Sequence, residues 1–288
     1  STAAETISLM HLRRSSQVSL SQKKGIPSSS SSEDRREVSS EVPTPSQREA
    51  LTKVPKLFST AYFPPVSYFA AMAQEMEGLI SRRDGDGSIG LSPSVVYIEA
   101  CENYQKQSYR NRCRFYAADG VQALSFPVVH ENGTHKIPIS EIKVDYSTPW
   151  LLQHKRAVVS AYRTSAYFEY YQDELFELLD SRPEKLIDLN MALLRFFIDK
   201  TGLRIDLRLT DEYSPNGLVK AEDGSVLSCE DLREVIHPKR PNSILSDLDL
   251  EKPYFQVFAR KYGFKSDLSV MDLLFNEGPD SILYLKRI

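Results

Sequence analysis

The succession of a strand, a Pro-Pro turn, a helix and a second strand constrains the fold of this chain most strongly. Residues 54–61 are typical of a strand, and Pro64-Pro65 then removes two backbone donors and forces a turn. Apolar residues recur with helical spacing over residues 66–80, and the apolar run 95–98 predicts a second, buried strand. This βαβ opening predicts a parallel pair of strands joined by a right-handed crossover.

The rest of the domain is expected to contain a β-hairpin and a largely helical C-terminal half. Asp119-Gly120 is a type I′ turn signal. The strands expected are 113–118 and 121–129 in the hairpin, an extended segment 136–146, a strand 205–209 and an edge strand 282–285. The helices expected are 150–162, 166–179, 183–200, a short one after a capping box at Ser228 that ends at His237, and 267–276 capped by Ser266. We therefore predict an α/β fold with a mixed sheet.

The first 53 residues differ from the rest. Fourteen of the first 50 are serine, and no Phe, Tyr or Trp occurs before Phe58. Such a segment buries too little surface to offset an ordering entropy of roughly 1–2 kcal/mol per residue. We predict a disordered Ser-rich tail over residues 1–53 and one α/β domain over residues 54–288. A tail without function is the favoured interpretation, and a regulatory tail is the alternative.

Composition excludes several classes of protein. The formal net charge of −3 and the pI near 6.0 offer no general basic field, so no nucleic-acid partner is expected. Cys101, Cys113 and Cys229 form no close pair, which predicts neither a disulfide framework nor a zinc site and favours the reducing cytoplasm. No run approaches the roughly 20 apolar residues of a transmembrane helix. Dinucleotide, Walker and nucleophile-elbow motifs are absent, and the sequence leaves the cofactor unknown.

A polar, cationic and aromatic segment, residues 99–115, directly follows the buried strand at 95–98. Such a position is where α/β proteins usually bind ligands. Arg110, Arg112 and Arg114 alternate and would share one face of a strand, where guanidinium groups favour phosphate or carboxylate. The alternative is a hairpin edge protected by charge, which these residues taken alone favour slightly.

His154 is the candidate general acid or base. It lies four residues after Trp150, on the same face of an amphipathic helix, and histidine is the commonest group in that role. The alternative, which the residues alone favour, is a histidine at the edge of the core. Asn190 and Glu277 occupy helix positions where polar groups can point inward, and their alternative is capping or solvent exposure.

Several blocks, in this order and spacing, resemble the WbqC-like protein family over about residues 54–288. The blocks are Tyr62-Phe63-Pro64, Tyr104-Gln105-Lys106, Asn111-Arg112, Phe126-Pro127-Val128, Trp150 with His154, Tyr162 and Tyr167-Phe168, Asp188-Leu189-Asn190, and the closing segments 253–258 and 269–278. The family is associated with gene clusters for bacterial lipopolysaccharide O-antigen and other surface glycans.

The resemblance implies an enzyme of surface-polysaccharide biosynthesis that transfers a group to or from an activated sugar or a related anionic metabolite, such as a sugar nucleotide. The alternative is a non-catalytic ligand-binding or scaffolding protein of a glycan-assembly system. His154 is then the catalytic candidate, and no metal site is predicted. The candidate substrate-binding residues are Tyr62, Lys106, Arg110, Asn111, Arg112, Asn190 and Glu277.

One block departs from the family pattern. Many members open with His-Gln-Pro-x-Tyr-Phe-Pro-Trp, whereas residues 58–65 here contain no His, Gln or Trp. If that histidine is catalytic in relatives, this protein is altered, inactive or uses another group. The opening in relatives also resembles nucleotidyltransferase-like and Rossmann-like α/β proteins, which is an analogy of fold alone.

Overall fold

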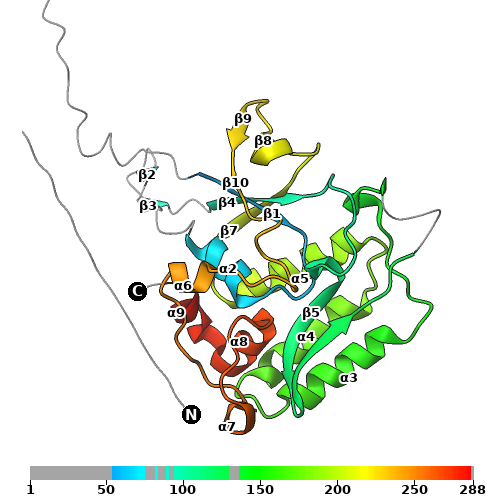
Figure 1. Cartoon of the computed structure of the whole chain (residues 1–288), viewed down its shortest axis with the longest axis vertical. Coiled ribbons are helices and arrows are strands. Elements are labelled where there is room, and N and C mark those ends of the chain that lie inside the picture. The colour runs from blue at the N-terminus through cyan, green and yellow to red at the C-terminus, as the bar shows by residue number, and fades with distance from the viewer. Residues whose placement is uncertain (1–53, 75–81, 84–88, 91–93, 130–135, 287–288) are drawn as a thin grey trace, which may run out of the picture. The chain divides into compact units, whose positions relative to one another are not determined.

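The structure, a computed structural model, describes residues 54–74, 82–83, 89–90, 94–129 and 136–286 (Figure 1). Its centre is a four-stranded sheet in the order β10-β1-β4-β7, with every neighbouring pair parallel. The strands are β1 (Lys56–Ser59), β4 (Ser94–Glu99), β7 (Ile205–Leu209) and β10 (Glu230–Asp231). The α/β class and the parallel pairing of the first two strands are confirmed.

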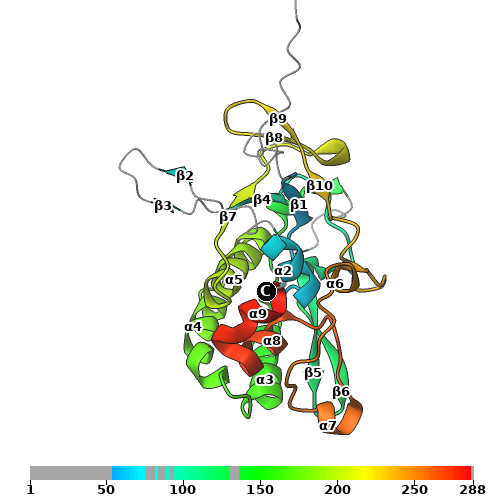
Figure 2. The same ribbon diagram turned by 90° about the vertical axis from the view of Figure 1, so that its left-hand side faces the viewer.

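The two faces of the sheet are covered differently, because successive side chains of a strand point to opposite sides. Leu57 and Tyr97 face a small cluster with Val219 and Cys229, which belongs to the β8–β9 side. Phe58, Val96 and Ile98 face the main core. The hairpin formed by β8 (Leu218–Lys220) and β9 (Val226–Ser228) lies on one side of the sheet and the helices lie on the other (Figures 1 and 2).

Helices supply most of the main core. All eight residues of α2 are buried, and ten of the fifteen residues of α5 are buried. The longer helices are α2 (Val66–Ala73), α3 (Trp150–Tyr162), α4 (Phe168–Asp180), α5 (Leu186–Lys200) and α8 (Val270–Glu277). The shorter ones are α6 (Ile244–Asp247), α7 (Ala259–Tyr262) and α9 (Ser281–Leu285). The apolar spacing in the sequence predicted helices α3, α4, α5 and α8 to within a few residues, because each of them buries one face.

The expected hairpin is present as β5 (Arg112–Ala117) and β6 (Gly120–Ser125), but its turn differs from the prediction. Ala117 pairs with Gly120, so the turn residues are Ala118 and Asp119. A type I′ turn needs positive φ at both central positions, and of these three residues only Gly120, at 114°, has one. The type I′ assignment was wrong because the glycine follows the turn. Another two-stranded pair joins β2 (Arg82–Arg83) to β3 (Ile89–Gly90).

Three further predictions were wrong. The segment 228–237 forms the end of β9, then β10, then turns, because residues 230–231 pair with β1. The segment 136–146 contains a 3-10 turn (Ile139–Glu141) and isolated bridges instead of a continuous strand, since the amides of Ile139 and Ser140 donate to the loop after β4. Residues 282–285 belong to helix α9, not to an edge strand.

The last long helix, α8, begins later in the chain than predicted. Ser269, not Ser266, caps α8 by accepting from the amide of Met271, and Asp267 has a left-handed φ of 52° that no helix tolerates. The predicted tail over residues 1–53 and the end of the predicted helix at 75–80 lie outside the described residues. Within the described part of the chain, no helix has both the length and the apolar character needed to cross a bilayer.

Candidate functional site: a cleft at the carboxyl ends of the parallel strands

The carboxyl ends of all four parallel strands meet along one edge of the sheet. Loops leaving such an edge form the ligand-binding crevice in open α/β sheets. A cleft of about 680 Å³ lies there. It is lined by residues 101–105 after β4, by Tyr213 and Asn216 after β7, and by Asp231, Arg233 and Glu234 at and after β10. The sheet therefore brings segments from distant parts of the chain to one polar hollow.

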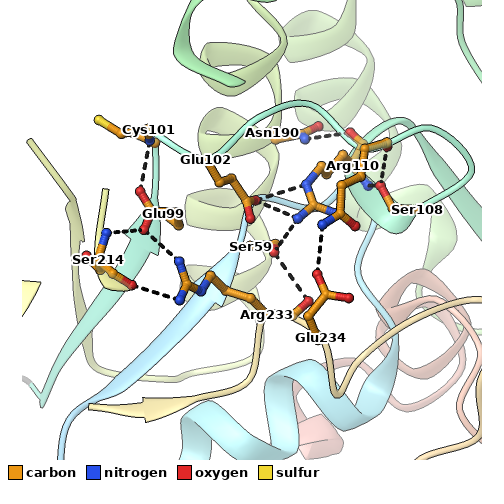
Figure 3. Close-up of polar contacts among 12 residues, drawn as sticks. Ser59, Glu99, Cys101, Glu102, Ser108, Arg110, Asn190, Ser214, Arg233 and Glu234 are labelled. Carbon is orange, nitrogen blue, oxygen red and sulfur yellow. Dashed lines mark hydrogen bonds and ion pairs between the residues drawn. The ribbon is translucent and has the colours of Figure 1, made fainter. Parts of the chain in front are cut away.

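A buried ion pair joins Arg110 to Glu102 at one wall of the cleft (Figure 3). The Arg110 Nη2 and Nε atoms lie 2.7 and 2.9 Å from Glu102 Oε1, and Nη2 also donates to Ser59 at 2.8 Å. Arg110 Nη1 donates to Gln105 at 3.4 Å. Burial raises the pKa of Glu102, while Arg110 opposes that rise. Glu102 is thus a cleft-lining carboxyl group whose charge is held by one guanidinium.

A second buried ion pair, between Arg233 and Glu99, lies beside the first (Figure 3). Arg233 Nη1 donates to Glu99 Oε2 at 2.9 Å, and Nη2 donates to the Ser214 carbonyl at 2.8 Å. Asp231 takes two more bonds from the same guanidinium, at 2.9 and 2.6 Å. Glu99 is fully buried and also accepts from the hydroxyl of Thr210 at 2.7 Å. This pair ties the carboxyl ends of β4, β7 and β10 together.

Side chains at the mouth of the cleft link its two walls. Gln105 donates to Glu234 at 2.8 Å, and Arg240 donates to the other oxygen of that carboxylate at 2.8 Å. Lys239 donates to Gln107. The loop after β4 is therefore tied to the segment after β10 across the cleft opening.

Cys101 supplies a thiol to the cleft lining, and Tyr213 supplies an aromatic ring. The Cys101 thiol is half-buried, and burial together with Glu99 raises its pKa, which disfavours the thiolate form that a nucleophile needs. The Tyr213 ring is 54 % exposed, and the Arg233 guanidinium carbon lies 5.2 Å from its centroid. The cleft thus offers a stacking ring whose one face is already occupied by a cation.

Among the residues predicted from sequence, Tyr62 and His154 lie together in the core. The Tyr62 hydroxyl is 2.9 Å from His154 Nδ1, and His154 Nε2 is 3.2 Å from the Ser125 carbonyl. A carbonyl only accepts, so Nε2 carries the proton and Nδ1 accepts from Tyr62. Burial lowers the pKa of His154 to about 4. Neither residue lines the cleft, and the acid–base role of His154 stays a prediction.

Asn111, Arg112 and Asn190 lie near Arg110 and have unpaired buried atoms. The Asn190 amide donates to the Arg110 carbonyl at 2.8 Å, and the Asn111 amide donates to the Phe126 carbonyl at 2.7 Å. In the described residues, the Oδ1 atoms of both asparagines and Arg112 Nε are buried without a partner. These residues support the loop that carries Arg110, and none of them lines the cleft.

Lys106 and Glu277 lie apart from these groups. Lys106 is exposed and directly follows Gln105, which lines the cleft. Glu277 accepts from the amide of Phe255 at 2.9 Å, near the end of α8. The structure therefore pairs Arg110 with the cleft-lining Glu102 and places Lys106 next in sequence to the cleft-lining Gln105. It pairs Tyr62 with His154 in the core and leaves Glu277 elsewhere.

Sequence reasoning missed the acidic half of the cleft. Glu99 and Glu102 lie within the segment singled out after the buried strand, so their position at a strand end was the available signal. Asp231 and Arg233 gave no such signal, because β10 is only two residues long. Within the described residues, no group of three or more His, Cys, Asp or Glu side chains is arranged to hold a metal ion.

Comparison with known proteins identifies the family to which this chain belongs. A model of the WbqC-like protein family matches residues 92–284. An uncharacterized protein of Mycobacterium tuberculosis, Rv1507c, is 27% identical over 208 residues, which is 67% of this chain and 87% of that protein. No solved structure matches the chain. Since the family model covers the sheet strands β4, β7 and β10 and the cleft loops that follow them, the chain belongs to the WbqC-like protein family.

Proposed function

We propose that this protein is an enzyme of bacterial surface-glycan assembly, acting in the cytoplasm, and that it transfers a group to or from an activated sugar. The supporting observation is the cleft of about 680 Å³ at the shared carboxyl edge of four parallel strands. Its size matches the 300–1,000 Å³ range of small-molecule sites. The glycan context comes from what the family is associated with.

Glu102 is the cleft residue best suited to proton transfer. It lines the cleft, and burial raises the pKa of its carboxyl group, which is the direction that favours general acid–base catalysis. Arg110 is a positioning residue in this scheme, because its bonds to Glu102 and Ser59 fix the carboxyl group relative to β1. Asn190 in turn holds the backbone carbonyl of Arg110.

The experiment compares Glu102→Gln with His154→Gln. Each variant and the wild type are incubated with UDP-, dTDP- and GDP-sugars, and products are followed by mass spectrometry. If Glu102 transfers the proton, Glu102→Gln lowers turnover by about 10²–10⁴-fold and His154→Gln leaves it within a few-fold. The reverse pattern assigns the role to His154. Both variants are first checked for native unfolding midpoints, because both side chains are buried.

Binding without turnover favours the alternative function, a ligand-binding protein of the same system. Its motivation is the block at residues 58–65, which has no histidine where many relatives carry one. Thermal stabilisation by a sugar nucleotide, with no product at any enzyme concentration, is the outcome that supports it.

A further inference from the structure

We propose that the cleft binds the uncharged, hydroxyl-rich ring of the substrate, and that Lys106 and Lys239 at its mouth bind the diphosphate. This division rests on the proposed function, since it assigns the parts of an activated sugar to parts of that same site. It also differs from the sequence-based expectation that Arg110 and Arg112 hold the anion.

The arginines of the cleft are already committed to protein acceptors. Each of the three guanidinium nitrogens of Arg233 donates to Glu99, Asp231 or the Ser214 carbonyl. Each of the three guanidinium nitrogens of Arg110 likewise donates within the protein. Each guanidinium thus uses four of its five N–H groups within the protein, so neither can offer a phosphate the paired hydrogen bonds with which arginine usually holds it.

The remaining lining suits hydroxyl groups. Glu102 and Asp231 are carboxylates, which accept up to about four hydrogen bonds each; Arg110 supplies two to Glu102 and Arg233 supplies three to Asp231, so both keep accepting capacity. Asn103 and Asn216 both donate and accept. A sugar hydroxyl does both as well, so it pairs with this set where a phosphate would meet repulsion from the carboxylates. The exposed Tyr213 ring adds an apolar face against which a sugar ring can lie.

Two lysines in the loops beside the cleft differ from its arginines, which are held in ion pairs. Lys106 and Lys239 are exposed, and no ion pair among the described residues involves either of them. Gln107 accepts from Lys239 and so keeps that ammonium beside the loop that carries Lys106. Two ammonium groups beside the same loop provide point charges for a diphosphate that leaves the cleft.

Titration calorimetry with inorganic diphosphate and with UDP-, dTDP- and GDP-sugars tests the division. The double variant Lys106→Ala/Lys239→Ala should lower the affinity for diphosphate and for the sugar nucleotides at least tenfold. The matched control, Lys252→Ala/Lys261→Ala, removes two exposed lysines remote in sequence from the cleft loops and should change neither. Tyr213→Ala should weaken only the sugar nucleotides, since diphosphate does not reach the ring.

The outcomes distinguish the assignment of the sugar ring and the diphosphate to parts of the site from the proposed function itself. If a sugar nucleotide binds and the Lys106/Lys239 variant binds it like wild type, or the control variant loses as much, the division is overturned and the proposed function stands. If Tyr213→Ala weakens diphosphate as strongly as the sugar nucleotides, the assignment of the ring to the cleft is overturned. If no sugar nucleotide and no diphosphate binds the wild type, both the division and the proposed function fail.

Discussion

The hydroxyl of Tyr62 and Nδ1 of His154, 92 residues apart in sequence, lie 2.9 Å apart in the core. Trp150 and Phe126 pack around this pair, with ring centroids 5.0 Å from His154 and 4.8 Å from Tyr62 respectively. The imidazole therefore joins the Pro-Pro turn after β1 to helix α3. Its neutral form is the one that satisfies both of its hydrogen bonds.

His154 should make the stability of the protein fall in acid. Its pKa is about 4 in the folded protein and 6.5 when unfolded, so the unfolded chain binds the proton first as pH falls. The stability it contributes is full above pH 6.5 and is lost between pH 6.5 and about 4, by roughly 3 kcal/mol. Urea unfolding of wild type and His154→Gln at steps between pH 7 and 4 measures this. Parallel pH profiles for the two proteins would contradict it.

Asp272 should have the opposite effect. It is fully buried, accepts bonds from Tyr162, Tyr254 and Gln256, and burial raises its pKa to about 6. A raised pKa means that the folded protein binds the proton first, so this group adds stability as pH falls from about 6 toward 3.8. The stability of wild type minus that of Asp272→Asn should therefore grow over this interval. A difference that is constant or shrinks toward acid is the contradicting result of the same denaturation series.

Removing Arg110 should be strongly destabilising. Its side chain is 3% exposed and that of Glu102 is 7% exposed, so Arg110→Ala leaves a buried carboxylate without its cation. We expect a loss of about 3–5 kcal/mol, and a smaller loss for the double change Arg110→Met/Glu102→Gln, which removes both charges. Lys185→Ala, which removes an exposed ion pair to Glu141, should cost less than about 1 kcal/mol. Equal losses for the two single variants in urea unfolding would refute the argument.

Gly278 should tolerate no side chain. Its φ of 55° and ψ of −128° favour glycine, and an added Cβ would lie 2.5 Å from the Tyr167 ring. Gly202 also has a positive φ, 77°, but an added Cβ there meets nothing within 4 Å. Gly202→Ala should cost about 1–2 kcal/mol from backbone strain alone, and Gly278→Ala about 1–3 kcal/mol more from the clash. Thermal unfolding of both variants measures the difference.

The elements that could be predicted from sequence are those with long local patterns. The helix at 150–162 and strand 205–209 were located to the residue, because their apolar spacing is a property of the segment itself. Strand β10 has only Glu230 and Asp231, and it exists because β1 pairs with it across the chain. The four apolar residues 282–285 were too few to separate a strand from a helix.

The sequence indicated which strand end carries the candidate cleft, but none of the site residues predicted from it lines that cleft. The segment after β4 does line the cleft, as its position at a strand end indicated. Arg110 was expected to bind an anionic ligand, but its guanidinium is instead bonded to Glu102, eight residues earlier in the chain. Arg233 pairs with Glu99, which is 134 residues away in sequence, and no short-range sequence pattern indicates such a pair. Which cations remain free for a ligand is decided by these long-range pairings.

The pairing of Lys56 with Glu230 also governs when the site can form during folding. The two residues are 174 positions apart, and strands β4 and β7 must join the same sheet from between them. Contacts so distant in sequence form slowly, because the intervening chain must close a very long loop first. On the ribosome, the cleft is then completed only after the chain has emerged past Glu234. A chain that stops before residue 229 lacks β10 and Arg233, and so it has no complete cleft.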